Sequence, residues 1–178
     1  MNTPLFQLPQ NRQSKGQRPK LAIERWAPVV WQTFESFCQK YGFFPTDADK
    51  AQAQAFLGPN GIITKFMHCP RCVEHWNTFA TANPPNTANR ETLTKWITAA
   101  HNSVNKKKHV DNPNVPLIIY PWEKACEDYY GVQWREQWEQ SRRIEWQNIQ
   151  IVQAYSNPGT APEVYTPDMT LDFEKTLY

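Results

Sequence analysis

Cys69-Pro70-Arg71-Cys72 and, further along the chain, His101-Asn102-Ser103-Val104-Asn105 are the two stretches that carry most information about the fold. A gap of two residues lets the thiols of the first stretch close a small disulfide or bind one metal ion. Pro70 suits the first turn of a helix, where its missing N–H costs no hydrogen bond. A thiol at a helix N-terminus meets the positive end of the helix dipole, which favours the reactive thiolate. By itself this motif is compatible with a redox pair, half of a zinc site, or chance.

The composition favours a helical domain. The 178 residues include only 6 Gly but 15 Pro and 8 Trp, and a low glycine content argues against a turn-rich β-sandwich. The mean hydropathy of −0.72 and the absence of a long apolar run predict no membrane span, and no secretory signal is recognised at the N-terminus. The net charge of +2, without basic residues interleaved with aromatic ones, favours no nucleic-acid partner.

Apolar residues recur at helical spacing through the middle of the chain. We expect a first helix within residues 21–41, with its true start near Pro28 because proline is tolerated there. Further helices are expected over 46–57, 72–82, 87–107 and 121–130. The predicted layout is therefore an extended arm (1–20), a helical domain (21–131), an additional helix (132–154) and an extended tail (155–178).

The helix expected over 87–107 has the clearest pattern. Its shared face carries Leu93, Ile97, Ala100, His101, Val104 and Asn105. His101 and Asn105 are four residues apart and so point the same way at adjacent levels. Taken singly, a histidine on an apolar helix face is more often part of the core than a ligand. Likewise, lysines at a helix end, such as 106–108, are more often solvated than bound to a ligand.

The order of these residues gives a more specific interpretation than any one of them. The pattern comprises Trp31-x-x-Phe34 with Tyr41 downstream, Phe66 three residues before Cys69, the CxxC motif, and Trp96-x4-His101-Asn102-x-Val104-Asn105. A later Trp122-Glu123-Lys124-Ala125 precedes Tyr129 and Tyr130. Over about residues 25–131, this pattern resembles the Erv/ALR family of FAD-dependent sulfhydryl oxidases.

The resemblance implies an all-α fold, a four-helix bundle plus a short fifth helix, with FAD at its mouth and often a homodimer. It implies that Cys69 and Cys72 are catalytic, with Cys69 facing the incoming thiol and Cys72 lying against the isoalloxazine. Electrons would pass from a dithiol protein to the flavin and on to O2, giving H2O2. The cofactor contacts that it implies are Trp31, Tyr41, Trp96, His101, Val104, Asn105 and Lys108.

The chain also departs from the pattern of the family. Glu35 stands where the family often has histidine four residues after the first tryptophan, and an acid there would repel the phosphates of FAD. No second CxxC is present to act as a shuttle. Minimal members without a shuttle occur in large DNA viruses, and the proline-rich arms fit a virus or phage particle. We therefore expect neighbours in a virion or another large assembly, and a location in the virion or the host cytoplasm.

Two other functions remain open at this stage. The first is a non-catalytic structural component of such a particle, which keeps the bundle and binds neighbours through its arms. The second is a zinc module that uses Cys69 and Cys72 with His75 or His68, although it lacks a second ligand pair at finger spacing; no metal is our preferred expectation. Cys38 and Cys126 either pair or remain free buried thiols.

Overall fold

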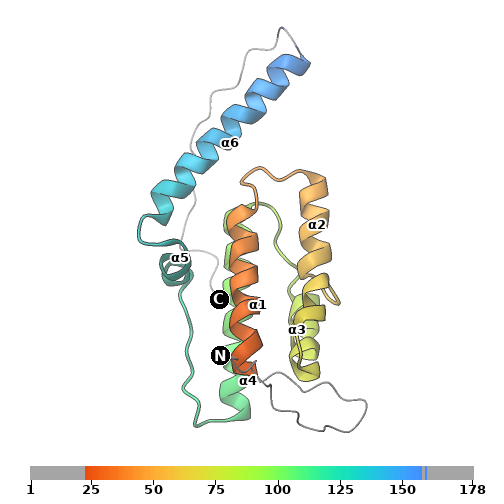
Figure 1. Cartoon of the computed structure of the whole chain (residues 1–178), viewed down its shortest axis with the longest axis vertical. Helices are drawn as coiled ribbons and strands as arrows, with labels where there is room; N and C mark the ends of the chain where they lie inside the picture. Colours follow the sequence, from red (N-terminus) through yellow and green to blue (C-terminus); the bar gives the residue numbers. More distant parts are fainter. Residues whose placement is uncertain (1–22, 158, 160–178) are drawn as a thin grey trace, which may run out of the picture.

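The computed structural model describes residues 23–157 and 159, and the regular elements within that part are all helical (Figure 1). They are α1 Ile23–Lys40, α2 Asp47–Leu57, the short 3-10 helix η1 Ile62–Phe66, α3 Pro70–Ala82, α4 Arg90–Asp111, α5 Trp122–Tyr130 and α6 Trp134–Ser156. The predicted all-α class, with a bundle, a short fifth helix and an additional helix, is confirmed. The predicted arm 1–20 and nearly all of the tail after α6 lie outside the described residues.

The expected start of the first helix was wrong. Instead of beginning near Pro28, α1 begins at Ile23 and runs through the proline. The missing N–H of Pro28 leaves only a carbonyl of the first helical turn without its partner, which is a small loss. The extra turn also buries Trp26, which is 9% exposed and belongs to the main core. Burial of this large ring therefore outweighs the local preference of proline for a helix start.

The helix starts of α2 and α4 are fixed by side-chain caps. Thr46 accepts a hydrogen bond from the backbone N–H of Asp49, whose carboxylate accepts one in return from the N–H of Thr46. Asn89 and Thr92 form the same reciprocal pair before α4. This second cap explains why α4 begins at Arg90 and not near Thr87, as the sequence pattern had indicated.

The main core lies where α1, α3 and α4 meet. The ring of Phe34 on α1 is fully buried and stacks on Trp76 of α3, with ring centroids 4.8 Å apart. Trp76 in turn meets Trp96 of α4 edge-on at 5.5 Å. Leu57, Ile63, Leu93 and Ile97 are also almost fully buried there. Phe34 of α1 thus lies at the centre of the bundle.

Helices α1 and α4 run antiparallel. Near one end, Arg90 at the start of α4 donates from Nε to the backbone oxygen of Tyr41, which follows α1, at 2.6 Å. Towards the other end, Trp31 of α1 stacks on His101 of α4. The imidazole of His75 on α3 lies 3.2 Å from the hydroxyl of Ser103, and so the start of α3 lies beside the later part of α4.

A second cluster joins α5 and α6 to the bundle. It contains Phe43, Trp122, Cys126, Trp134 and Trp138, all buried. Trp122 and Trp134 meet edge-on at 5.1 Å, and Phe43 meets Trp138 at 5.8 Å. The tryptophans in the first half of α6 therefore pack onto the domain.

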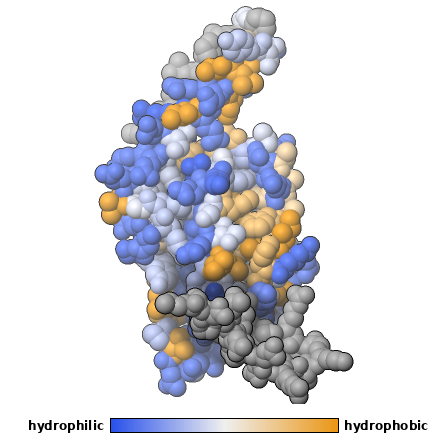
Figure 2. Space-filling view, in the orientation of Figure 1, coloured by the Kyte–Doolittle hydropathy of each residue, from blue (hydrophilic) through white to orange (hydrophobic). Residues whose placement is uncertain are grey.

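The second half of α6 projects beyond the bundle (Figure 1). Its base is held by Glu145, whose carboxylate accepts hydrogen bonds from the backbone N–H groups of Phe43 and Phe44 at 3.0 and 2.9 Å. Beyond this anchor Ile151 and Val152 are 54% and 64% exposed, and Figure 2 shows apolar residues at this end of the helix. Among the described helices, none is long and apolar enough to cross a membrane.

We predict that Glu145→Ala loosens α6 without unfolding the bundle. The substitution removes both charge-assisted hydrogen bonds to the Phe43–Phe44 backbone and costs roughly 1–3 kcal/mol of docking free energy. Hydrogen exchange of the amides in the second half of α6 should speed up, while exchange in α1 and α4 should not change. Gln147→Ala, on an exposed position of the same helix, is the control. If the amides in the second half of α6 exchanged equally slowly in both variants, the hydrogen bonds of Glu145 would not be needed to hold this helix.

Candidate functional site

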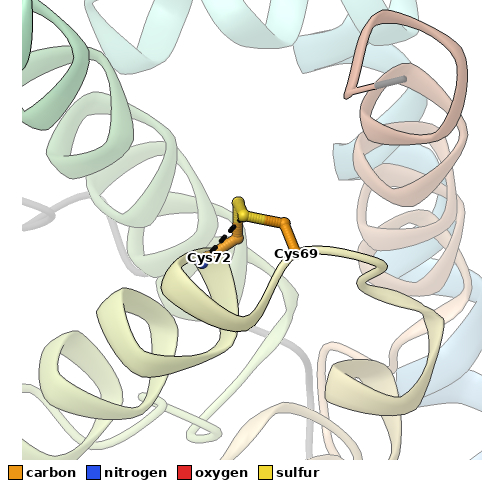
Figure 3. Close-up of a disulfide and its surroundings, with 2 residues drawn as sticks. All are labelled: Cys69 and Cys72. Atoms are coloured by element: carbon orange, nitrogen blue, oxygen red, sulfur yellow. Dashed lines mark hydrogen bonds between the residues drawn. A yellow bond between two sulfur atoms is a disulfide. The ribbon is translucent and has the colours of Figure 1, made fainter. Parts of the chain in front are cut away.

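The start of α3 is formed by the CxxC motif itself. Cys69 is the N-cap, Pro70 occupies the first turn, and Cys69 and Cys72 form a disulfide with their Cα atoms 5.2 Å apart. The backbone N–H of Cys72 donates to Sγ of Cys69 at 3.2 Å (Figure 3). Both sulfurs thus lie at the positive end of the helix dipole, where a thiolate is stabilised. The predicted helix start at Pro70 is confirmed.

The disulfide lies between the main core and the surface. Both cysteines are partly buried and pack against the main core cluster. On the outer side, His68 and Arg71 are exposed and Phe66 is 58% exposed. A partner molecule can therefore approach the disulfide from outside the bundle, while the opposite side of the disulfide faces the core.

An aromatic stack links α1 to α4. The rings of Trp31 and His101 are 4.0 Å apart and within 14° of parallel. The ring of Tyr120, from the α4–α5 connection, lies 5.8 Å from that of His101. Burial and the nearby charge of Lys108 lower the pKa of His101, which keeps the imidazole neutral at neutral pH.

A cavity of about 100 Å³ opens beside this stack, between α1, α4 and α5. It is lined by Glu35, Thr98, His101, Tyr120, Ala125, Asp128 and Tyr129. His101 lies three residues after Thr98 on one face of α4, and Glu35 lies four residues after Trp31 on one face of α1. The cavity thus combines aromatic walls with a hydroxyl, an imidazole and two carboxyl groups.

Glu35 is the unusual group of this cavity. Its side chain is buried, and its Oε2 accepts a hydrogen bond from the hydroxyl of Tyr130 at 2.8 Å. Burial raises the pKa of Glu35 to about 7, and the Tyr130 bond offsets only part of that rise. Burial and the nearby Glu35 raise the pKa of Tyr130, and so the phenol remains the donor.

The connection between α4 and α5 is bound to α4 by side chains. Asn102 donates to the backbone oxygen of Tyr120 and accepts from its N–H, both at 2.9 Å. Asn105 donates to the backbone oxygen of Ile118 at 2.9 Å, and the imidazole of His109 lies 2.8 Å from the oxygen of Val115. We call residues 115–120 the strap. The polar residues at the end of α4 therefore fix the strap, which carries Tyr120 to the cavity.

The structure brings only some of the predicted cofactor contacts together. Trp31 and His101 form the stack, and Val104 and Asn105 follow on the same helix, with exposed Lys108 one turn on. Two predicted contacts lie elsewhere. Tyr41 is buried past the far end of α1 and donates to the oxygen of Thr87, and Trp96 packs on Trp76 and donates to the oxygen of Asn83.

Some residues of the cavity were missed from the sequence. Thr98, Asp128 and Tyr129 line it, and Tyr120 reaches it from the strap. The position of Thr98 three residues before His101 on one helix face could have revealed it. The other three come from α5 and the strap, whose packing on α1 and α4 no local pattern indicates.

The remaining cysteines are separate thiols. Cys38 and Cys126 are buried and unpaired by any disulfide, which decides between the two alternatives left open by the sequence. Burial raises the pKa of both thiols, which makes them poor nucleophiles. Within residues 23–157 and 159, no group of three or more His, Cys, Asp and Glu side chains is arranged to hold a metal ion.

Comparison with known proteins agrees with this arrangement. The model of the Erv1/Alr family matches residues 28–139, which include the disulfide, the aromatic stack and every residue that lines the cavity. The chain belongs to the Erv1/Alr family. The family match ends within the first half of α6, before the projecting part of this Erv1/Alr protein.

A curated relative and two solved structures are similar to this Erv1/Alr chain. The mitochondrial FAD-linked sulfhydryl oxidase ERV1 of Saccharomyces cerevisiae is 29% identical over 106 residues, which cover 60% of this chain and 52% of the relative. The chain thus matches about half the length of that relative. The crystal structure of the yeast Erv1 core has a TM-score of 0.54 and 24% identity, covering 70% of this chain and 97% of the core. A cysteine-to-serine mutant of yeast Erv1 has a TM-score of 0.52 at 24% identity, covering 68% and 73% of the two chains.

We predict that Glu35 makes the protein less stable as pH rises. The pKa of Glu35 is raised from 4.5 to about 7 in the folded state, and so the folded protein holds this proton more tightly than the unfolded chain. Its contribution is fully present below pH 4.5 and is lost as pH rises through about 7. Between pH 5 and pH 8 the free energy of unfolding of the wild type should fall by about 2 kcal/mol more than that of Glu35→Gln.

Urea denaturation at several pH values measures this difference. The control is Glu123→Gln, which removes an acid of α5 outside the cavity and should leave the pH dependence of the wild type unchanged. If the free energy of unfolding changed with pH in the same way for the wild type and for Glu35→Gln, Glu35 would titrate as an ordinary carboxyl group.

Proposed function

We propose that this protein is an FAD-dependent sulfhydryl oxidase that converts dithiols of a protein substrate to disulfides, with reduction of O2 to H2O2. The observation that carries the proposal is the Cys69–Cys72 disulfide at the start of α3, open to the outside and backed by the core that holds Trp31 and His101. Membership of the Erv1/Alr family and the FAD-linked function named for the yeast relative support it.

The first half of the reaction is thiol–disulfide exchange at the cysteine pair. A substrate thiolate attacks Sγ of Cys69, a mixed disulfide forms, and Cys72 leaves as a thiolate. The positive end of α3 stabilises this leaving group because Cys72 lies in the first helical turn. The second substrate thiolate then attacks the substrate sulfur of the mixed disulfide and releases Cys69. The substrate is oxidised by two electrons, and the cysteine pair is reduced by the same two.

The residues beside the cavity fit a flavin. Trp31, His101 and Tyr120 offer aromatic faces, and neutral His101 and the Thr98 hydroxyl offer polar groups at the cavity. Exposed Lys108 supplies a positive charge to the same end of α4. Binding sites for cofactor-sized ligands are usually several times larger than about 100 Å³, and so this cavity takes only one part of the cofactor. Bound FAD supplies the acceptor for the two electrons and their transfer to O2.

The cofactor contacts predicted from the sequence fall into two groups with different roles in this proposal. Trp31, His101, Val104, Asn105 and Lys108 form one continuous region and are proposed to hold the cofactor. Tyr41 and Trp96 act from the core, where they fix the end of α1 and the packing of α3 on α4. We also propose that the protein forms a homodimer.

A structural role in a large assembly, such as a virion, is the second candidate. The observation that favours it is the projecting half of α6, which lies beyond the family match and exposes Ile151, Val152 and Tyr155. In this alternative the bundle is a scaffold and the neighbours bind α6 and the terminal arms. Such a protein needs neither flavin nor a reactive disulfide.

The absorbance spectrum of the purified full chain separates the two candidates. The oxidase should be yellow, with a flavin band near 450 nm that bleaches when a dithiol is added without oxygen and returns with air. Protein refolded with excess FAD and then freed of unbound cofactor should keep that band. A colourless protein after this treatment would favour the structural role.

Replacing one cysteine tests the redox role directly. Cys72→Ser leaves no disulfide at the start of α3 and should reduce oxygen consumption with dithiothreitol to the uncatalysed rate, while the flavin band remains. Cys38→Ala removes a buried thiol that forms no disulfide and should keep the wild-type rate. An unchanged rate in Cys72→Ser would show that oxidation occurs elsewhere.

A further inference from the structure

Among the described residues, the buried carboxyl group of Glu35 has no positive partner. Its one side-chain hydrogen bond comes from the neutral hydroxyl of Tyr130, and no salt bridge to it is found among residues 23–157. The nearest arginine of α4, Arg90, instead donates to the oxygen of Tyr41. An ionised carboxylate in this position is therefore both desolvated and uncompensated.

The groups that face Glu35 from the neighbouring elements do not supply a charge either. Four of these groups have raised pKa values and are therefore neutral at neutral pH. They are Cys38 of α1 and Cys126, Tyr129 and Tyr130 of α5. His101 of α4 has a lowered pKa and is neutral as well. Asp128 of α5, at the exposed side of the cavity, is a second carboxyl group, and it forms a salt bridge with Lys124 at 2.7 Å. The surroundings thus favour the protonated form of Glu35.

FAD carries two negative charges on its pyrophosphate, and its ring systems carry many hydrogen-bond acceptors. A protonated Glu35 can donate its O–H to an acceptor in the cavity that it lines, whereas an ionised Glu35 repels the cofactor and can only accept. The distance of Glu35 from Trp31, one helical turn, places it in the region proposed to hold the cofactor. One proton on this side chain therefore reverses its interaction with the ligand.

We propose that Glu35 makes flavin binding conditional on its own protonation, so that the protein binds FAD tightly when this carboxyl group is neutral and loses it as the group ionises. The inference rests on the proposed function, because it takes FAD as the ligand of the cavity. It concerns a residue of this chain that replaces the histidine expected from the family pattern.

The expected change in the dissociation constant for FAD follows from the linkage between FAD binding and protonation of Glu35. If only the protonated form binds FAD and the group titrates at about 7, the dissociation constant rises about 25-fold between pH 6.5 and pH 8.5. At pH 8, binding takes up about 0.9 proton per FAD, and at pH 6 about 0.1. The imidazole of His101 stays neutral throughout this upper range because its pKa is lowered.

Calorimetric titration of FAD into the flavin-free full chain tests the proposal. Titrations at pH 6.5, 7.5 and 8.5 give the dissociation constants, and buffers of different ionisation enthalpy give the proton uptake. Wild-type protein should show the 25-fold change and the uptake at high pH. Glu35→Gln, which is uncharged and of nearly the same shape, should bind with a dissociation constant that does not change over this range and without proton uptake. Far-UV circular dichroism confirms that it is folded.

Asp128→Asn is the matched variant, because it neutralises the other carboxyl group of the cavity. It should keep the pH dependence and the proton uptake of the wild type. The proposal is overturned if FAD binds equally well at all three pH values, if Glu35→Gln keeps the pH dependence, or if Asp128→Asn alone removes it. Those three results leave the oxidase function standing. A wild-type chain that binds no FAD at any pH instead refutes the proposed function, and this inference with it.

Discussion

The antiparallel packing of α1 on α4 is the contact on which the rest of the structure depends. At one end the Arg90 side chain is bonded to the backbone of Tyr41, and towards the other the rings of Trp31 and His101 are stacked. Between them Phe34 and Ile97 are completely buried. Two long helices pressed together in this way hold their side chains in fixed rotamers, because interiors are packed as densely as crystals. The surface that they share provides one wall for the cysteine pair and another for the cavity.

The other helices attach to this pair in two groups with different tasks. On one side α3 carries the disulfide at its start, and the stacking of Trp76 on Phe34 holds this helix against α1. On the other side α5 and the strap close the cavity with Tyr120, Asp128 and Tyr129. The second aromatic cluster and the carboxylate of Glu145 then hold α6. The Cys69–Cys72 disulfide and a polar cavity thus face one shared core from different sides.

Glu35 shows how a single residue can couple folding to the site. The side chain is buried beside α5, and its hydrogen bond with Tyr130 joins α1 to α5. A neutral carboxyl group suits this environment, and an ionised one does not, because burial removes its water and no salt bridge to it is found in the part of the chain that the structure describes. The same desolvation therefore costs stability and sets the electrostatics of the cavity. Many functional sites show such conflicts between stability and charge.

The fold and part of the site could be predicted from the sequence. Helical spacing of apolar residues gave the number and order of the helices, and the threonine and asparagine caps are local signals. The CxxC motif and Pro70 indicated a helix start at the cysteine pair, whereas the disulfide was one of the alternatives that the spacing left open. Local rules failed at Pro28, where burial of Trp26 extends α1 through the proline. The family pattern also includes Tyr41 and Trp96, and only the structure shows that they lie in the core and do not line the cavity.

The sequence by itself determined the helices and the place of the cysteine pair at a helix start, because a hydrophobic period, a cap and a two-residue gap act within one or two helical turns. Only the tertiary structure decided which side chains meet. The stack of Trp31 on His101, the strap held by Asn102 and the cavity around Glu35 join residues far apart in the chain. Their contacts depend on how whole helices pack and on the water that this packing excludes. The unusual pKa of Glu35 arises from that exclusion and has no counterpart in the local sequence.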